Sequence, residues 1–485
     1  MDLTGHRFKA RPLAYLTEEQ MRDIHSASLQ VLQDVGTVVH HPEARRLLVQ
    51  AGARLVEGNR VHLPADVVEA ALRSAPSRIS IYDRRGNPAM YLEGRRTFFG
   101  TGSDCPYLLD SFSGERRPFQ EEDVHQAVTL VDGLEHIDFC MSMGHLPMHG
   151  DQASYQVEYA AMLRHSSKPQ VITAGDRQSL EDQTEMAAAV VGGLEQLRSR
   201  PLFVLYDEPT SPLTHSFEAL DKLLFMAEHR LPSNYSPGIM AGGTSPVTLA
   251  GAITQANAEI LAGLTIHQLK RPGAPFVHGA GVSPMDMRSM QPTYSAPEAI
   301  IGQAGLTQIG RDLYNLPTWG FTGCSASKLC DEQAVYEAYS YLYTAAHMGT
   351  NLVHDVGYLE FGLTYSLDLL VFCNEMIGQV LRLMDGIEVN AETLALEAMR
   401  RVGPGGHFLG DDHTFDHFRD NWTPELTDRN TFEVWQDSGK GRSMGQRVKD
   451  RIRTILDEHH PLPLTTEADA EIEAILKRVK ARGRG

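Results

Sequence analysis

The most constraining feature of the chain is a regular alternation of short apolar segments with helical stretches. Each apolar segment is followed by a loop rich in Gly, Asp or Ser, and then by a stretch with helical periodicity. The segments are RTFFGTGSD (96–104), IDFCMSMGH (137–145), PQVITAGD (169–176), PLFVLYDEP (201–209), NYSPGIMAGG (234–243), PFVHGAGV (275–282), PTWGFTG (317–323) and NLVHDVG (351–357). Eight strand–helix units predict an α/β fold of the (β/α)8 TIM barrel type. An open doubly wound sheet has the same periodicity and stays an alternative.

The sequence on either side of this alternation has a different pattern. Before it, two helical stretches (16–36 and 64–76) precede a hairpin pattern around RRGN (84–87). After it, the chain is helical and loop-rich and ends in an amphipathic helix. We therefore predict three regions: an N-terminal helical and hairpin region (1–96), a barrel core (97–385) and a C-terminal helical extension (386–485).

Charge and cysteine content restrict the compartment and the partners. A formal net charge of −18 over 485 residues disfavours binding to nucleic acid or to an anionic membrane. The N-terminal sequence lacks the apolar core of a signal peptide, and no window is apolar over a bilayer-spanning length. The five cysteines form no CxxC pair, which is typical of a reducing compartment. We expect a cytoplasmic protein, and self-association stays open.

In a barrel, chemistry takes place in the loops that follow the carboxyl ends of the strands. Polar residues at these positions are Asp104, His145, Asp176, Glu208, His278, Cys324, His354 and Asp355. Aromatic residues near the same ends include Tyr107, Tyr358 and Phe361. Rings combined with a carboxylate such as Glu208 suit a quaternary ammonium, with about 0.5–2 kcal/mol per ring contact. For any single ring, packing in the core or loops is the simpler interpretation.

The loop WGFTGCSASKLCDEQ (319–333) places a cysteine directly after the seventh apolar segment. It lacks the run of glycines that brings several amides onto one phosphate, which disfavours a phosphate site. As a nucleophile, Cys324 would need a base, and His354 or His278 could supply one from a neighbouring strand. As a small buried packing residue, Cys324 would need no base beside it. Because free cysteines are usually buried, we favour packing over nucleophilic catalysis by about two to one.

Other motifs for metals and cofactors are missing from the sequence. It contains no HExxH and no GxxxxGK[ST], and the glycine-rich GPGGHFLG (403–410) follows a helix instead of a strand. No lysine stands on a predicted strand as a Schiff-base candidate. The sequence therefore predicts no structural metal and no cofactor bound tightly by this chain.

Several long segments resemble the trimethylamine methyltransferase family. They are AGGTSPVTLAGAITQANAEILAGLTIHQLKRPGAPFVHG (241–279), SASKLCDEQA (325–334), NLVHDVGYLEFGLTYSLDLLVFCNEMIG (351–378) and GPGGHFLGDDHT (403–414). Two N-terminal segments, HPEARRLLVQAGARL and LPADVVEAALRSAPSRISI, match as well. The resemblance covers nearly the whole chain. It implies a (β/α)8 barrel that passes a methyl group from an amine to the cobalt of a separate corrinoid protein.

The resemblance also implies that Cys324 occupies the position of pyrrolysine in other members of the family. Trimethylamine-specific members carry pyrrolysine just before a Ser-x-x-Lys stretch, which Ser325 and Lys328 match here. A thiol cannot form the imine adduct of pyrrolysine, whereas a quaternary ammonium already has a neutral tertiary amine as its leaving group. The resemblance therefore implies a quaternary amine substrate, with glycine betaine as first choice. Proline betaine, carnitine, a non-catalytic betaine-binding protein and a hydrolase or lyase with a Cys324 nucleophile remain as alternatives.

The implied reaction is an in-line displacement by Co(I) on an N-methyl carbon, with the corrinoid (cobalamin) supplied by a cognate corrinoid protein. DDHTFD (411–416) has Asp416 where the corrinoid-binding pattern DxHxxG needs glycine. We expect Tyr358 and Phe361 to face the methylammonium and Glu208 to balance its charge. His278 or His354 would hydrogen-bond the substrate's carboxylate, and Cys324 would shape the space that pyrrolysine fills in other members. Asp104 and Tyr107 complete the predicted walls.

Overall fold

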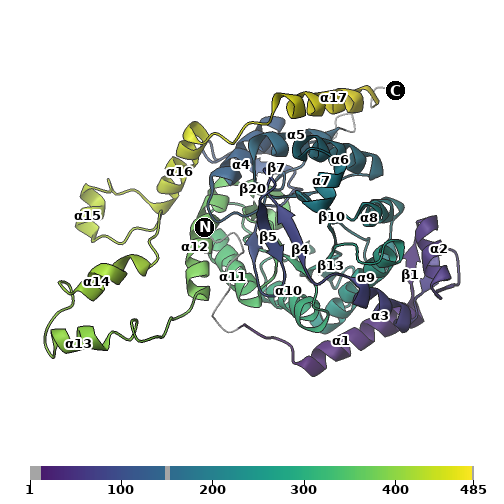
Figure 1. The fold of residues 1–485 in the computed structure, drawn as a ribbon, viewed down its shortest axis with the longest axis horizontal. Helices are drawn as coiled ribbons and strands as arrows, with labels where there is room; N and C mark the ends of the chain where they lie inside the picture. The colour runs from purple at the N-terminus through teal and green to yellow at the C-terminus, as the bar shows by residue number, and fades with distance from the viewer. Residues whose placement is uncertain (1–11, 148–152, 483–485) are drawn as a thin grey trace.

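The computed structural model describes residues 12–147 and 153–482. Its centre is a curled parallel sheet of seven strands in the order β6-β18-β17-β14-β12-β10-β9. The strands are β6 (Phe98–Phe99), β9 (Gln170–Ile172), β10 (Phe203–Asp207), β12 (Ser233–Tyr235), β14 (Phe276–Gly279), β17 (Thr318–Phe321) and β18 (Leu352–His354). Figure 1 shows helices arranged around this sheet. The fold is therefore a mixed α/β fold, and seven of the predicted segments contribute strands to the sheet.

The second predicted segment, 137–145, does not form a regular strand. Phe139 makes an isolated parallel bridge with Gly100, and Cys140 makes another with Gln170. These partners lie directly after β6 and at the start of β9, which are the two edges of the seven-stranded sheet. The segment therefore lies between the two edges and touches each by a single bridge.

Two local features explain why this segment is not a strand. The backbone N–H of Met141 donates to the hydroxyl of Thr101 at 2.9 Å, so a side chain replaces a backbone carbonyl as its partner. Met143 has a φ of 70°, a conformation that a strand excludes. This segment therefore forms single parallel bridges in place of a regular strand.

Two other predicted segments each form two strands. Residues 234–243 contribute β12 and then β13 (Gly238–Ala241), and residues 275–282 contribute β14 and the start of β15 (Gly281–Asp286). Strand β13 pairs with β15, which pairs with β16 (Gln291–Pro292) in a separate three-stranded sheet. Pro237 separates β12 from β13, since proline has no N–H for a ladder. The chain thus leaves the central sheet, and β13, β15 and β16 form a separate sheet beyond the carboxyl ends of the central strands.

Helices connect successive strands on the outside of the sheet. Asp176, Ser216 and Asp331 accept backbone N–H groups at the starts of three of them, and Gly349 ends one with a φ of 69°. The helices of this region are α4 (Glu121–Gly133), α5 (Ser154–His165), α6 (Arg177–Val191), α7 (Leu194–Ser199), α8 (Phe217–His229), α9 (Leu249–Lys270), α10 (Pro297–Gln308), η2 (Ile309–Leu313), α11 (Glu332–Met348) and α12 (Leu367–Met384).

A hairpin packs against the inside of the curled sheet. It consists of β4 (Ile79–Tyr82) and β5 (Pro88–Leu92), as the RRGN pattern predicts. Its apolar residues share one buried cluster with side chains of the central strands, among them Val277 and Trp319. Figure 1 shows the hairpin in front of the middle of the sheet. The hairpin therefore fills part of the space inside the curled sheet.

The rest of the N-terminal region packs beside α8 and α9. The helix predicted over 16–36 is α1 (Glu18–Gln30) continued by a π-helical turn, and it ends at Gly36 with a φ of 77°. The other elements are η1 (Val31–Val35), β1 (Thr37–Val39), α2 (Pro42–Gln50), β2 (Arg54–Leu55), β3 (Arg60–His62) and α3 (Ala65–Ser74). Strand β11 (Thr214–His215) joins β1 in the sheet β11-β1-β3-β2.

A second small sheet covers the loops after β6 and β18. Its order is β19-β20-β7-β8, from β7 (Tyr107–Leu109), β8 (Arg116–Pro118), β19 (Tyr358–Leu359) and β20 (Thr364–Ser366). A short 3-10 turn, η3 (Glu360–Gly362), links β19 to β20. Pairing of β20 with β7 places the segment that contains Tyr107 beside the segment that contains Tyr358 and Phe361.

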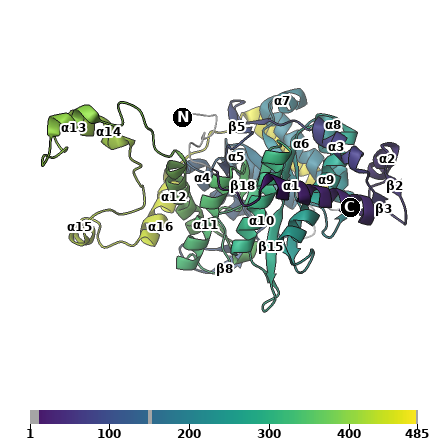
Figure 2. The same cartoon turned by 90° about the horizontal axis from the view of Figure 1, so that it is seen from below.

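The chain after α12 is helical, and no strand follows β20 up to residue 482. Its elements are α13 (Leu396–Val402), α14 (Asp412–His417), η4 (Phe418–Asp420), α15 (Phe432–Asp437), α16 (Met444–Glu458) and α17 (Thr466–Arg482). Helix α16 packs on α4 and α12, and α17 packs on α5 and α6. Figures 1 and 2 show that α13, α14 and α15 project away from the rest of the molecule. Within the described ranges, no helix combines the length and apolar character needed to cross a membrane.

Candidate functional site

A cavity of about 290 Å³ lies at the carboxyl ends of the central strands. Its walls come from the segments that follow β6, β10, β12, β17 and β18, and from the outer sheet of β13, β15 and β16. The lining residues are Asp104, Tyr206, Glu208, Ser236, Gly238, Ile239, Met240, Gly281, Ser283, Pro292, Tyr294, Phe321, His354 and Asp355. Ligands of parallel α/β folds bind at this edge of the sheet.

A larger groove of about 900 Å³ lies elsewhere, mainly between α11, α12 and α16. None of the residues predicted for the site lines it. Since the smaller cavity combines rings, carboxylates and the carboxyl edge of the sheet, we assign the candidate site to it.

Asp104 is held in place by Tyr358. The Tyr358 hydroxyl donates to Oδ1 of Asp104 at 3.0 Å and accepts the Asp104 backbone N–H at 2.9 Å. Gly102 makes room for this contact, since a Cβ there would lie 2.2 Å from the Tyr358 hydroxyl oxygen and 2.4 Å from Oδ1 of Asp355. Tyr358 is itself buried and lies behind Asp104. The tyrosine therefore orients a carboxylate without lining the cavity.

The cavity gathers three carboxyl groups: Asp104, Glu208 and Asp355. Burial raises the pKa of Glu208 to about 7, although a hydrogen bond from Tyr206 opposes the rise. Burial also raises the pKa of Asp104, and the nearby Asp355 raises it further. The Asp104 and Glu208 side chains line the cavity and are exposed to solvent through its opening. A bound cation would favour their ionised forms.

Aromatic rings stack along the floor of the cavity. The rings of Trp319, Tyr206 and His354 form a three-membered cluster. The centroid of Trp319 lies 5.1 Å from that of Tyr206 and 4.3 Å from that of His354, and the latter two are 5.3 Å apart. Nδ1 of His354 lies 2.7 Å from Oδ1 of Asp355. Phe321 contacts Tyr294 from the opposite wall at 5.0 Å. The rings and the three carboxyl groups together make a cage suited to a cation.

Among the polar residues predicted from the strand ends, the structure brings Asp104, Glu208, His354 and Asp355 together in the cavity. His145 lies 3.0 Å from Glu158 instead, and Asp176 caps the start of α6. Tyr358 joins them indirectly through Asp104. Their roles toward a substrate stay predictions, because geometry alone does not test them.

His278 does not reach the cavity. Its Nε2 lies 3.1 Å from Oδ1 of Asn257 on α9, and its ring packs edge-on against Tyr314. Alternate side chains of a strand point to opposite faces, and the neighbouring Val277 belongs to the interior cluster. His278 therefore points outward, where burial lowers its pKa to about 3.

Cys324 also lies outside the cavity, fully buried in the core beside it. Burial raises the pKa of its thiol well above the ordinary range, and the acidic Asp355 raises it further. A reactive cysteine needs the opposite environment, with a base or a positive charge beside it. The surroundings of Cys324 therefore fit a buried packing residue.

Tyr107 and Phe361 lie in the small sheet over the loops, and neither lines the cavity. The Arg116 guanidinium covers the Tyr107 ring at 3.6 Å from its centroid. The Lys328 ammonium lies 4.8 Å from the centroid of the Phe361 ring. One face of each ring is thus already covered by a cation of the chain itself.

The sequence patterns missed Tyr294, Ser236 and Ser283, which line the cavity. Tyr294 lies between β16 and α10, in a segment with no strand–helix signal. Ser236 and Ser283 lie in or beside the outer sheet, which the patterns merged with the central strands. In the described ranges, no three His, Cys, Asp or Glu side chains are grouped as a metal ion requires. The expectation of no structural metal stays a prediction.

Comparisons with known proteins agree on one family. The family model described as trimethylamine methyltransferase (MTTB) matches residues 4–484. The trimethylamine methyltransferase MttB of Desulfitobacterium hafniense (strain DSM 10664 / DCB-2) is 30% identical over 96% of this chain and 94% of its own length. The glycine betaine methyltransferase of Desulfitobacterium hafniense (strain Y51) is 29% identical over 95% of this chain and 96% of its own.

Solved structures agree on the fold. The crystal structure of the Methanosarcina barkeri monomethylamine methyltransferase (MtmB) superposes with a TM-score of 0.54, covering 94% of this chain and 90% of that one. At 13% sequence identity, this similarity concerns the fold alone.

Proposed function

The chain belongs to the trimethylamine methyltransferase family, and from this premise we propose that it transfers a methyl group from a quaternary amine to the Co(I) corrinoid of a cognate partner protein. Its relatives are methyltransferases of methylated amines, so a binding protein without catalysis is not retained. The observation that carries the quaternary amine is the cavity, which combines aromatic faces with three carboxyl groups at the carboxyl edge of the sheet.

In the proposed reaction, a C–N bond of the substrate breaks and its electron pair stays on nitrogen. The leaving tertiary amine is neutral, so no proton donor is required. The corrinoid supplies the nucleophile and accepts the methyl group. Asp104 and Glu208 would hold the cation, the rings of Tyr206, Phe321 and His354 would orient its methyl groups, and the enclosed walls would limit water.

Two architectural features belong to this proposal. We propose that the sheet closes into an eight-stranded barrel with residues 139–140 as its remaining member, supported by the bridges to Gly100 and Gln170. We also propose that the region 97–385 carries the activity, since every residue that lines the cavity lies in it.

The direct test is a methyl-transfer assay of purified protein with Co(I) cobalamin or with its corrinoid protein. The panel contains glycine betaine, the first choice from the sequence, together with proline betaine, carnitine, choline and trimethylamine. We expect one methyl group to leave a quaternary amine per turnover, with the tertiary amine as product. Activity on trimethylamine and on none of the quaternary amines would contradict the proposal.

Cation binding should depend on pH through Glu208. Its pKa of about 7 in the folded protein lies above the ordinary value of 4.5, so Glu208 is protonated below pH 7 and ionised above it. The groups that face it are Tyr206, which donates a hydrogen bond, the acidic Asp104 and Asp207, and His354. Ionisation falls about tenfold between pH 8 and pH 6, and the affinity for tetramethylammonium should fall by up to that factor. Calorimetry at both values measures this.

The control for this pH dependence is Glu208→Gln, whose affinity should be low and nearly constant over the same range. A wild-type affinity that rises toward pH 6 would show that ionised Glu208 does not hold the cation.

Replacing Cys324 with Ala should leave methyl transfer within about threefold of the wild type. The thiol is buried outside the cavity, and its raised pKa removes it as a nucleophile. Steady-state kcat/KM for the best quaternary amine measures the effect, and Cys373→Ala, a second fully buried cysteine, is the matched control. A loss of a thousandfold in the Cys324 variant alone would favour covalent catalysis by this cysteine.

A further inference from the structure

We propose that the substrate is a quaternary ammonium cation with a neutral polar tail, such as a quaternary ammonium alcohol, and that the cavity discriminates against betaines. This inference rests on the proposed function and names the substrate class of the same site. A betaine carries a carboxylate close to its nitrogen, so both groups enter the cavity together. The selection then depends on which charges the walls hold.

The charges on the walls are predominantly negative. Asp104, Glu208 and Asp355 line the cavity, and no Lys or Arg is among the described residues that do so. His354 is the one basic group of the lining, and its Nδ1 already lies 2.7 Å from Oδ1 of Asp355. A substrate carboxylate would therefore meet three carboxyl groups, and His354 would be its one basic neighbour among the described lining residues.

Two cationic side chains in the surrounding segments, Lys222 and Arg116, have other partners. Lys222 lies 2.9 Å from Asp207 and donates to the backbone carbonyl of Ala174 at 2.7 Å. Arg116 pairs with Glu360 at 2.8 Å and covers the Tyr107 ring. Moving either one toward a substrate would leave a partner carboxylate unpaired, which is unfavourable where that carboxylate is buried, as Asp207 is.

The remaining polar groups of the cavity suit a neutral tail. Ser236 and Ser283 line it with hydroxyl groups, which donate to and accept from an alcohol or amide equally well. Gly238 and Gly281 add backbone without side-chain bulk. The cavity thus offers anionic and aromatic groups for the ammonium head and neutral groups for the rest.

The test is calorimetric binding of four probes to the full chain at pH 8, without corrinoid. The probes are choline, tetramethylammonium, glycine betaine and 3,3-dimethylbutan-1-ol, the uncharged isostere of choline. We expect choline to bind at least tenfold more tightly than glycine betaine and at least tenfold more tightly than the isostere. Equal or tighter binding of glycine betaine would overturn the inference, and so would equal binding of the isostere.

Variants connect this selectivity to the named carboxyl groups. Glu208→Gln and, separately, Asp104→Asn should each reduce the choline-to-betaine affinity ratio at least threefold. The control Glu218→Gln, on the exposed start of α8, should leave the ratio unchanged. A ratio that stays at the wild-type value in both cavity variants would contradict this origin of the selectivity.

The methyl-transfer panel separates this inference from the proposed function. Demethylation of glycine betaine but not of choline would overturn the inference and leave the proposed function intact. Demethylation of choline in preference to betaine supports both. If no quaternary amine is demethylated, the proposed function fails, and the binding ratio still decides the charge selectivity of the cavity.

Discussion

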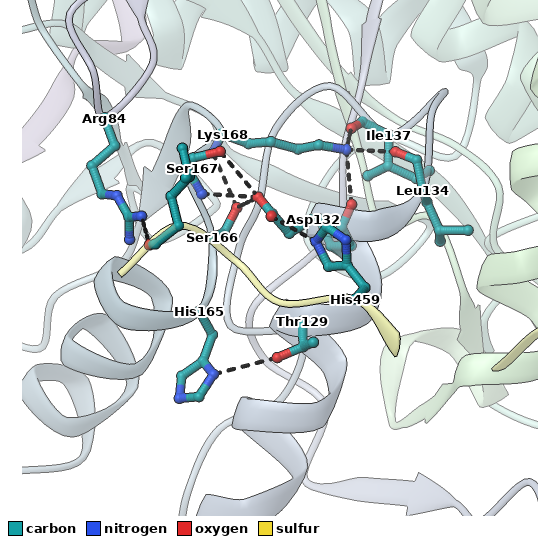
Figure 3. Close-up of polar contacts among 12 residues, drawn as sticks. Arg84, Thr129, Asp132, Leu134, Ile137, His165, Ser166, Ser167, Lys168 and His459 are labelled. Atoms are coloured by element: carbon teal, nitrogen blue, oxygen red, sulfur yellow. Dashed lines mark hydrogen bonds and ion pairs between the residues drawn. The ribbon is translucent and has the colours of Figure 1, made fainter. Parts of the chain in front are cut away.

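Replacing Lys168 with Met is expected to lower the free energy of unfolding by about 3–5 kcal/mol. The Lys168 ammonium donates to the backbone carbonyls of Val131 at 2.8 Å and Leu134 at 2.5 Å, and to that of Ile137 (Figure 3). Methionine has a stem of similar length but no donor. The carbonyls of Leu134 and Ile137 would lose this donor, at a cost of about 1–3 kcal/mol each. The Val131 carbonyl would lose one of two donors, since it also accepts the Leu134 backbone N–H at 3.2 Å.

The position of these carbonyls explains why the loss should be large. They end α4 and begin the segment 137–140, which bridges the two edges of the central sheet. Beside them, Asp132 accepts the Ser167 backbone N–H at 2.8 Å and lies 2.9 Å from Nε2 of His459, in the chain that follows α16 (Figure 3). Lys168 therefore stabilises the part of the sheet with the fewest ladder hydrogen bonds.

Urea denaturation followed by circular dichroism measures this effect as a lower midpoint. Lys477→Met, on the exposed face of α17, is the matched control and should change the free energy of unfolding by no more than about 0.5 kcal/mol. Equal midpoints for the two variants would show that the carbonyls of Leu134 and Ile137 find other partners.

The periodicity of the sequence predicts the central strands well, because each is a short apolar run bounded by turn residues. Applied to strand ends, the same principle names eight polar residues, of which Asp104, Glu208, His354 and Asp355 line one cavity. The other four, His145, Asp176, His278 and Cys324, do not line it. Position along the chain was informative here because parallel strands place their carboxyl ends at one edge.

The same principle fails for His278, since position along a strand does not fix the face. Successive side chains of a strand point to opposite faces. Since the apolar Val277 is suited to the interior, its neighbour His278 could have been predicted to point outward. No comparable signal exists for Tyr107 and Phe361, because the cations over their rings depend on tertiary contacts. Arg116, for example, pairs with Glu360, which lies 244 residues away in the sequence. Tyr294 likewise enters the cavity from a connection without a periodic pattern.

The double variant Asp104→Asn/Glu208→Gln is expected to lower kcat/KM for the best quaternary amine by about 10³-fold, or about 4 kcal/mol. Both carboxylates line the cavity, and each would interact with the cation directly once it is bound there. Each single variant should lose about 10- to 100-fold. Tyr358→Phe should lose less than Asp104→Asn, since it removes the two hydrogen bonds that orient Asp104 and keeps the charge.

Stability distinguishes this functional role from a structural one. Burial raises the pKa of both carboxyl groups, so the empty cavity disfavours their ionised forms, and neutral amides remove that penalty. The thermal midpoint of the free double variant should therefore equal or exceed that of the wild type at pH 8, while its stabilisation by tetramethylammonium disappears. Glu218→Gln should keep wild-type values in both measurements. A double variant that is destabilised, yet retains kcat/KM among its folded molecules, would show that these two carboxyl groups serve the fold and not the substrate.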